Sequence, residues 1–201
     1  MKNPDIALVH VDAVPRSVFS EFERLVRADN LDVRVESRPE LGPMASMLWY
    51  VPTAIFVYIS KSYFDGFLKE MGKEHYASLK AGIKSLYARW VGPEAPSVTL
   101  HGTKGKIAPE QPYSLVFSVV ADAGNRATFK LLIQQGISES EYELAAAAFL
   151  GFLEAYHARS LDDGTLRSLR EARSVGNTLL LAYDLQSNRI EPVGLTREPG
   201  A

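Results

Sequence analysis

The 201-residue chain contains no cysteine. This absence excludes disulfide bonds, thiolate metal sites, iron–sulfur clusters and a cysteine nucleophile. We expect neither a cofactor nor a metal ion. The first residues also lack the positively charged start, long apolar stretch and small-residue cleavage site of a secretory signal, so we expect a cytoplasmic protein.

An excess of positive charge is missing as well. There are 22 Lys and Arg residues against 24 Asp and Glu residues, and the formal net charge is −2. Proteins that bind nucleic acid mainly through its phosphates carry clustered Lys and Arg, whereas here the two signs are interspersed. The sequence therefore argues against a nucleic-acid partner.

Charge of either sign is absent from Leu41 to Ser60, between Glu40 and Lys61. These twenty residues match the length of an apolar helix that crosses a bilayer, so membrane association is one hypothesis. Trp49 lies in the middle of the run, however, and not at an end, where the aromatic residues of membrane-spanning helices gather. The sequence therefore favours a soluble protein over a membrane partner.

Pro52 divides this charge-free run into two parts. The residue before a proline is disfavoured in the α region, so residues 44–51 are predicted to form a short helix. Residues 53–59 are rich in Ile, Phe, Val and Tyr, which predicts a buried central strand. One helix from Pro52 through Ser60 is the alternative.

The first forty residues have the pattern of a βαβ unit. Residues 6–11 form a short apolar run typical of a buried strand. A helix is predicted to begin at Pro15, and polar and apolar residues then alternate over 31–36, as in an edge strand. Residues 61–90 continue with a helical pattern that a break near Gly72 divides in two.

The second half of the chain changes from helical to extended patterns after Gly92-Pro93. A hairpin turn over 122–126 is predicted to join two strands. Ser138 and Glu141 have the spacing of a capping box, which predicts a helix that ends near Arg159. The further predicted elements are strands over 97–101, 113–121, 127–133 and 178–184, a turn over 162–164 and a short helix over 165–173.

These elements predict an α/β fold, with a mixed sheet and helices on both faces. The N-terminal half is of the βαβ type, and the C-terminal half combines antiparallel strands with a long helix. We expect a single domain over 1–201. The alternative is a subdivision into a βαβ-like half, 1–92, and a hairpin-and-helix half, 97–195.

The densest polar cluster contains Glu70, Glu74 and His75. Glu70 and Glu74 are four residues apart, so their carboxylates share one helix face. Such a pair raises the pKa of one carboxyl group, which suits acid–base catalysis, and His75 adds a ligand-binding nitrogen. A solvated helix face explains the same residues. The two histidines of a zinc protease are absent.

Polar residues also follow the predicted strands. His10 and Asp12 end the first strand, Glu36 ends the second, and Ser60 ends the third. If these strands are parallel, their carboxyl ends meet at one edge of the sheet, where ligands bind in α/β proteins. The sequence then predicts a small-ligand site at that edge.

Residues 54–70 resemble the third-strand region of TIR domains. In that family an apolar strand ends in serine, here Ser60, and an aromatic residue follows three positions later, here Tyr63. Leu68 stands where the family has tryptophan, and neither Glu70 nor Glu74 stands at the family's acidic position. The resemblance implies an NAD-processing activity.

Three functional hypotheses follow from the sequence. The first is a soluble, non-catalytic interaction or regulatory protein, with a protein partner or a second copy of the chain. The second is an enzyme that acts on a nucleotide-like small ligand at the strand ends, and TIR-like NAD processing is one version of it. The third is membrane association through residues 41–60.

Overall fold

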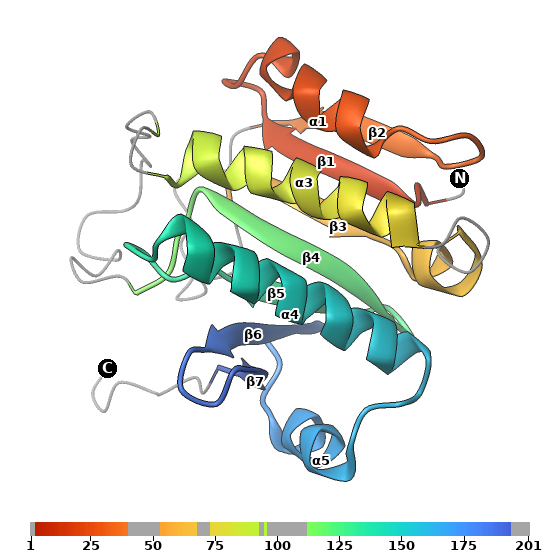
Figure 1. Ribbon diagram of the computed structural model, residues 1–201, viewed down its shortest axis with the longest axis vertical. Helices are drawn as coiled ribbons and strands as arrows, with labels where there is room; N and C mark the ends of the chain where they lie inside the picture. The colour runs from red at the N-terminus through yellow and green to blue at the C-terminus, as the bar shows by residue number, and fades with distance from the viewer. Residues whose placement is uncertain (1–2, 40–52, 68–72, 93–94, 96–111, 194–201) are drawn as a thin grey trace.

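The computed structural model describes residues 3–39, 53–67, 73–92, 95 and 112–193 (Figure 1). Seven strands form one mixed sheet in the order β2-β1-β3-β4-β5-β6-β7. The strands are β1 (Ile6–Val11), β2 (Val33–Arg38), β3 (Ile55–Ile59), β4 (Phe117–Gly124), β5 (Ala127–Leu132), β6 (Thr178–Asp184) and β7 (Arg189–Pro192).

Parallel and antiparallel pairing alternate from one edge of this sheet to the other. The pairs β1–β2, β3–β4 and β5–β6 are parallel, and the pairs β1–β3, β4–β5 and β6–β7 are antiparallel. Because β3 pairs with β4, a single sheet joins the two halves of the chain. The α/β fold and the mixed sheet expected from the sequence are confirmed.

The helices come from the connections between the strands. They are the 3-10 turn η1 (Arg16–Phe19), α1 (Ser20–Val26), the π-helical turn η2 (Tyr63–Phe67), α3 (Lys73–Trp90), α4 (Glu139–His157) and α5 (Asp163–Glu171). Helices α1, α3 and α4 lie side by side on one face of the sheet (Figure 1). The sequence suggested helices on both faces, but these three share one face.

The connection from β5 through α4 to β6 has an unusual hand. A right-handed crossover, found in about 98% of such units, places α1 and α3 on one face. Strand β5 runs opposite to β3 and β4, but β6 lies beyond β5 in the same direction across the sheet as β4 lies beyond β3. A right-handed crossover from β5 to β6 would therefore place α4 on the face opposite to α3. Helix α4 packs beside α3 instead, and this crossover is left-handed (Figure 1).

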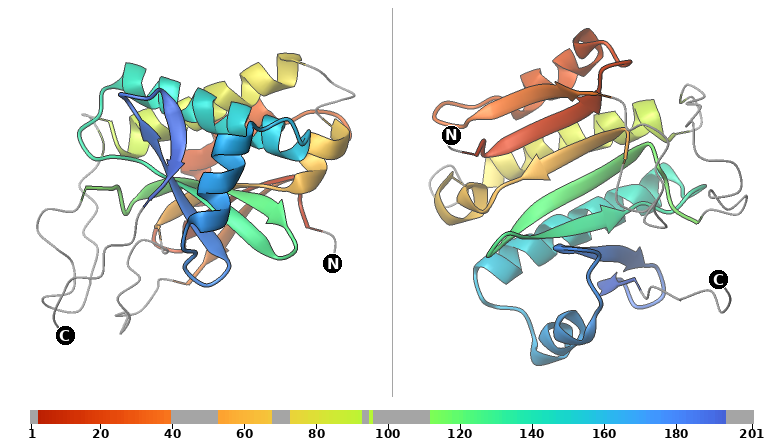
Figure 2. Two further views of the ribbon diagram at one scale, coloured as in Figure 1. Left: turned by 90° about the horizontal axis from the view of Figure 1, so that it is seen from below. Right: turned by 180° about the vertical axis from the view of Figure 1, so that it is seen from behind.

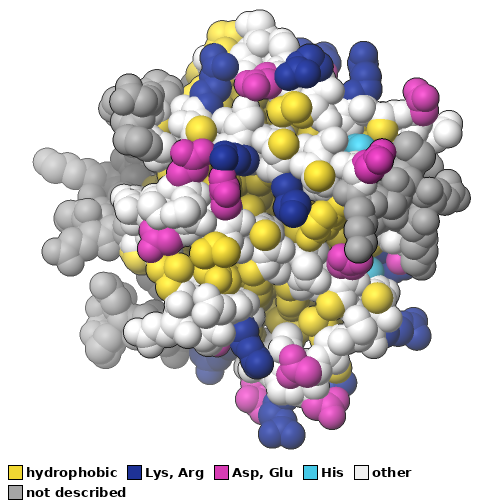
Figure 3. Space-filling model, in the orientation of Figure 1, with side chains coloured by type: hydrophobic (Ala, Val, Ile, Leu, Met, Phe, Trp, Pro, Cys, Tyr) yellow, Lys and Arg dark blue, Asp and Glu magenta, His cyan; other side chains and the backbone are white. Residues whose placement is uncertain are grey.

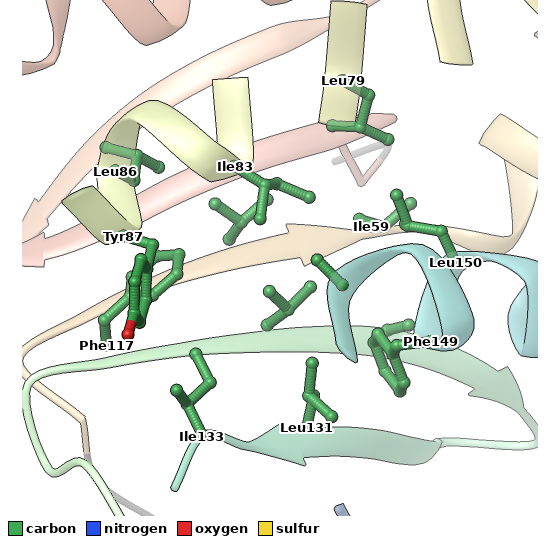
Figure 4. Close-up of a cluster of buried hydrophobic side chains, with 14 of the residues drawn as sticks. Ile59, Leu79, Ile83, Leu86, Tyr87, Phe117, Leu131, Ile133, Phe149 and Leu150 are labelled. Atoms are coloured by element: carbon green, nitrogen blue, oxygen red, sulfur yellow. The ribbon is translucent and has the colours of Figure 1, made fainter. Parts of the chain in front are cut away.

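One hydrophobic core fills the space between the sheet and the three helices. Ile83 and Tyr87 of α3 and Phe149 of α4 point toward the strands (Figure 4). The rings of Tyr87 and Tyr142 stack with centroids 3.7 Å apart, which joins α3 to α4. The burial of these aromatic and branched side chains is the main force that holds the layers together.

Local signals place most of the described elements correctly. The Ser138 capping box is present, since the Ser138 hydroxyl accepts from the Glu141 backbone N–H and the Glu141 carboxylate accepts from that of Ser138. The predicted turn over 162–164 is wrong, because Asp162 caps α5 and the helix begins at Asp163. Strand β7 was not predicted.

The charge-free run is described only in part. Ile55–Ile59 is a strand between β1 and β4, so a single helix through this part of the run is excluded. The predicted helix over 44–51 and the predicted strand over 97–101 lie outside the described residues. Within the described ranges, no helix has both the length and the apolar character needed to cross a membrane.

Candidate functional site

The residues predicted at the strand ends do not meet at one edge of the sheet. Strand β3 is antiparallel to β1, with Ile6 opposite Ile59 and His10 opposite Ile55. Ser60 therefore lies beside the start of β1, whereas His10 lies near its end. Four residues of strand separate these two ends, which is about 13 Å. The predicted site that joins His10 to Ser60 is wrong for this topological reason.

Ser60 instead forms part of a hydrogen-bonded junction with Asp5. Its backbone N–H donates to the Asp5 carbonyl oxygen at 2.9 Å, and its hydroxyl lies 2.6 Å from that of Ser62. The Ser62 hydroxyl donates to the Asp5 carboxylate, which also accepts from the Asp32 backbone N–H at 3.1 Å. This junction joins the ends of β1, β2 and β3, which is a structural role.

His75 is also a structural residue of the core. It is 6% exposed, and its Nε2 donates to the Val26 carbonyl oxygen at 2.8 Å. In the neutral ring, Nδ1 then accepts from the Tyr63 hydroxyl at 3.1 Å. His75 therefore joins α3 to α1 and to the turn after β3. Glu74, the next residue back, is exposed, and Glu70 lies outside the described residues.

The remaining predicted residues are divided between the two faces of the sheet. His10 is 2% exposed, and its ring packs 4.7 Å from that of Phe19 in the core. Asp12 and Glu36 are exposed. Because β1 and β2 are parallel, these three residues do lie near the same edge, as the sequence predicted. Within the described ranges, no group of three acidic or histidine residues could hold a metal ion.

Among the residues that the structure describes, the helical face has no concentration of charge of one sign. Figure 3 shows acidic and basic side chains interspersed over α1, α3 and α4. Lys84 of α3 pairs with both Glu139 and Glu143 of α4, and the Lys84–Glu139 distance is 3.1 Å. These exposed pairs connect neighbouring helices.

The opposite face of the sheet carries a different set of side chains. We call it the rear face; the right-hand view of Figure 2 shows its strands in front of the helices. Side chains alternate between the faces of a strand, and directly paired residues share a face. Phe56 pairs with Ser118, and Val120 pairs with Lys130, so these four residues belong to the rear face.

Arg38, the last residue of β2, extends over this face. Its guanidinium lies 5.0 Å from the centre of the Phe56 ring, and one of its terminal nitrogens donates to the Thr53 carbonyl oxygen. Its Nε is buried and has no hydrogen-bond partner within the described ranges. Burial lowers the pKa of Arg38, because a charged group loses hydration there. A donor of this kind is stabilised by an acceptor that the described residues do not supply.

Two buried hydroxyl groups lie next to Arg38. Thr53 is 3% exposed and Ser118 is fully buried, and the distance from Thr53 Oγ1 to Ser118 Oγ is 2.7 Å. Each hydroxyl group can donate one hydrogen bond, and their mutual contact uses only one of the two protons. The second proton can therefore be donated to a further acceptor.

Lys130 lies on the neighbouring strand and is 1% exposed. It is diagonal to Ser118 across the β4–β5 ladder, a spacing of about 7–8 Å between Cα atoms. Burial lowers its pKa to about 7, with a second contribution from the positive charge of Arg38. The amine of Lys130 is therefore partly uncharged near neutral pH.

Arg38, Thr53, Ser118 and Lys130 together are the candidate site. The sequence hypothesis missed it, although one signal was present: Lys130 is the single charged residue in the run from Ala127 to Ile133. A lysine in a buried strand is costly, so it marks a position that deserves a functional hypothesis. No protein-family model, curated protein or solved structure matches the chain.

Proposed function

We propose that this protein binds a small anion on the rear face of its sheet, through Arg38, Thr53, Ser118 and Lys130. In this proposal the protein is non-catalytic, as in the leading sequence hypothesis, but its partner is a small anion and not a protein. The observation that carries the proposal is the position of Arg38. Its guanidinium is held between Phe56 and the Thr53 carbonyl, and the buried Nε has no hydrogen-bond partner among the residues that the structure describes.

The charges of the site favour an anion over a neutral ligand. Arg38 and Lys130 are both cations when protonated. A nearby negative charge stabilises a cation strongly in a region of low dielectric. Arg38 has no ion pair among the described residues, and the nearest acid of its own strand on this face, Glu36, is exposed. A carboxylate or phosphate group would accept from the guanidinium and from a hydroxyl group.

The alternative of an enzyme at the strand ends has lost its geometric support. Ser60 and His75 serve the junction and the core, and His10 lies at the other end of β1 from Ser60. The same finding removes the support for a TIR-like site, because that resemblance depends on the Ser60 region. A protein partner or a second copy of the chain stays a prediction of the sequence.

Anion-dependent thermal stability tests the proposal. The melting temperature is measured against phosphate, sulfate and acetate, with chloride at matched ionic strength as the reference. An anion that binds the folded state raises the melting temperature in a saturable way, by mass action. We expect saturable stabilisation by at least one of the three anions in the wild-type protein.

Arg34 provides the matched control for this measurement. It lies on the same strand and the same face as Arg38, but its guanidinium pairs with Asp32 at 2.5 Å. Arg38→Gln should abolish the saturable shift, and Arg34→Gln should keep it. An unchanged shift in Arg38→Gln, or no saturable shift with any of the anions, would overturn the proposal.

A further inference from the structure

We infer that the Lys130 side chain is a nucleophile that forms an imine with the carbonyl group of an anion bound beside Arg38. The ligand class is then a small oxo acid or an aldehyde that carries a carboxylate or phosphate group. This inference rests on the proposed anion site and deepens it. It assigns different tasks to the two cations, because Arg38 holds the negative charge and Lys130 reacts.

The position of Lys130 supports a chemical role. Its directly paired neighbours are Val120 of β4 and Leu180 of β6, so the Lys130 side chain stands between two apolar side chains on this face of the sheet. Lys61 and Lys84 lie at the surface instead: the side chain of Lys61 is 52% exposed and that of Lys84 is 46% exposed, each in an ion pair. Lys130 alone among these three combines burial with a nearby cation.

The same surroundings make the amine reactive at neutral pH. Only an uncharged amine attacks a carbonyl carbon, and a lysine becomes uncharged when it is desolvated or placed beside another cation. Both conditions hold here, with burial as the larger cause and Arg38 as the second. Burial and Asp122 raise the pKa of Tyr58, which lies on the same face. The other charged side chains that the strand pairing assigns to this face are Arg34, Glu36, Asp122, Asp184, Arg189 and Glu191.

The proposed step conserves atoms and charge. The lone pair of the Lys130 Nζ attacks the carbonyl carbon, the nitrogen gives up one proton and the carbonyl oxygen takes one up, which gives a neutral carbinolamine. The new hydroxyl group then leaves as water together with the second nitrogen proton, and a C=N bond joins the ligand to Lys130. One of the two hydroxyl groups, of Thr53 or of Ser118, donates to the other. The remaining hydroxyl proton can be donated to the carbonyl oxygen of the ligand as negative charge develops there.

Reductive trapping tests the inference on the intact chain. Glyoxylate, chosen because it is small and anionic, is added with sodium borohydride, which reduces an imine to a stable secondary amine. Propionaldehyde is the uncharged comparison probe. Peptide mass mapping then measures the modified fraction of Lys130 and, in the same sample, of Lys84. We expect glyoxylate to modify Lys130 preferentially, and propionaldehyde to show no such preference for it.

Variants separate recognition of the anion from reactivity of the amine. Arg38→Gln should lower glyoxylate modification of Lys130 roughly tenfold or more, the loss expected when a charged hydrogen bond is removed. Arg34→Gln should leave it unchanged. Lys130→Met should remove the adduct. Because that variant also changes the core, the pH dependence of wild-type modification serves as a second measurement: its midpoint should lie near 7 for Lys130 and well above that for Lys84.

The outcomes distinguish this inference from the proposed function. Saturable anion stabilisation without a Lys130 adduct would overturn the inference and leave the anion site standing. An equal response of Lys130 to both probes, or modification confined to Lys84, would also overturn it. The absence of both the adduct and the stabilisation would overturn the two proposals together.

Discussion

Asp5 and Ser60 join the start of β1 to the end of β3, through a hydrogen bond of 2.9 Å from the Ser60 backbone N–H to the Asp5 carbonyl oxygen. The bond shows directly that the two strands run in opposite directions. It also explains why a serine that resembles a strand-end ligand residue belongs to a structural junction.

We predict that Asp5→Asn destabilises this junction. The carboxylate accepts from the Asp32 backbone N–H and from the Ser62 hydroxyl, and an amide nitrogen would face one of these donors. We expect a loss of about 1–3 kcal/mol in the free energy of unfolding, measured in urea. Asp12→Asn, at an exposed position, should change it by less than about 0.5 kcal/mol. Equal effects of the two substitutions would contradict the structural role of Asp5.

His75→Phe should destabilise the core in a similar way. The substitution keeps an aromatic ring but leaves the Val26 carbonyl and the Tyr63 hydroxyl without this partner. We expect a loss of about 2–4 kcal/mol in the free energy of unfolding. Glu74→Ala, one residue away on the exposed side of α3, is the control and should be nearly neutral. Wild-type stability in His75→Phe would show that the histidine does not hold α1 and α3 together.

Two glycine substitutions should change the free energy of unfolding in opposite directions. A Cβ at Gly82 would lie 2.7 Å from Val26 Cγ2 and 3.1 Å from Phe22 Cδ2, so Gly82→Ala forces α1 and α3 apart. We expect a loss of about 1–3 kcal/mol. A Cβ at Gly151 of α4 meets nothing within 4 Å, so Gly151→Ala should gain about 0.5–1 kcal/mol from helix propensity. Chemical denaturation of both variants measures this difference, and matching signs would contradict the packing of α1 on α3.

The stability of the protein should rise with pH above neutrality because of Lys130. Its folded-state pKa is about 7, below the ordinary lysine value of 10.5, so the unfolded chain binds more protons between these two pH values. The free energy of unfolding therefore increases as the pH rises through this window, by at most about 1.4 kcal/mol per pH unit.

Lys130→Met isolates that contribution, because it removes the titrating amine and keeps an unbranched side chain. The difference in unfolding free energy between wild type and Lys130→Met should shift in favour of the wild type from pH 7 to pH 9. Lys84→Met, at an exposed position, should show no such trend. A pH-independent difference for Lys130→Met would contradict the lowered pKa.

Much of the fold is predictable from local patterns in the sequence. The apolar run over 6–11, the alternation in β2 and the capping box at Ser138 each report on the residues that form the element itself. Such signals depend on side-chain spacing and on backbone hydrogen bonds within a few residues. Strand β7 escaped prediction because four residues, Arg189–Pro192, are too few for a periodic pattern.

The candidate site required the tertiary structure. Arg38 stands far from Ser118 and Lys130 in the sequence, and the pairings of β2 with β1, of β1 with β3 and of β3 with β4 bring it to their face of the sheet. The direction of a strand within a sheet is decided by long-range pairing, which local composition does not encode. For the same reason, the sequence could not show that Ser60 lies away from His10.

The sequence by itself determined the α/β class, the strand in the second part of the charge-free run and the absence of cysteine chemistry, because composition and short-range periodicity are properties of the chain. The tertiary structure decided that β3 opposes β1, that α4 lies beside α3, and that Lys130 is buried near Arg38. These features depend on which distant segments pack together, and packing changes the hydration and the pKa of a side chain whose identity stays the same.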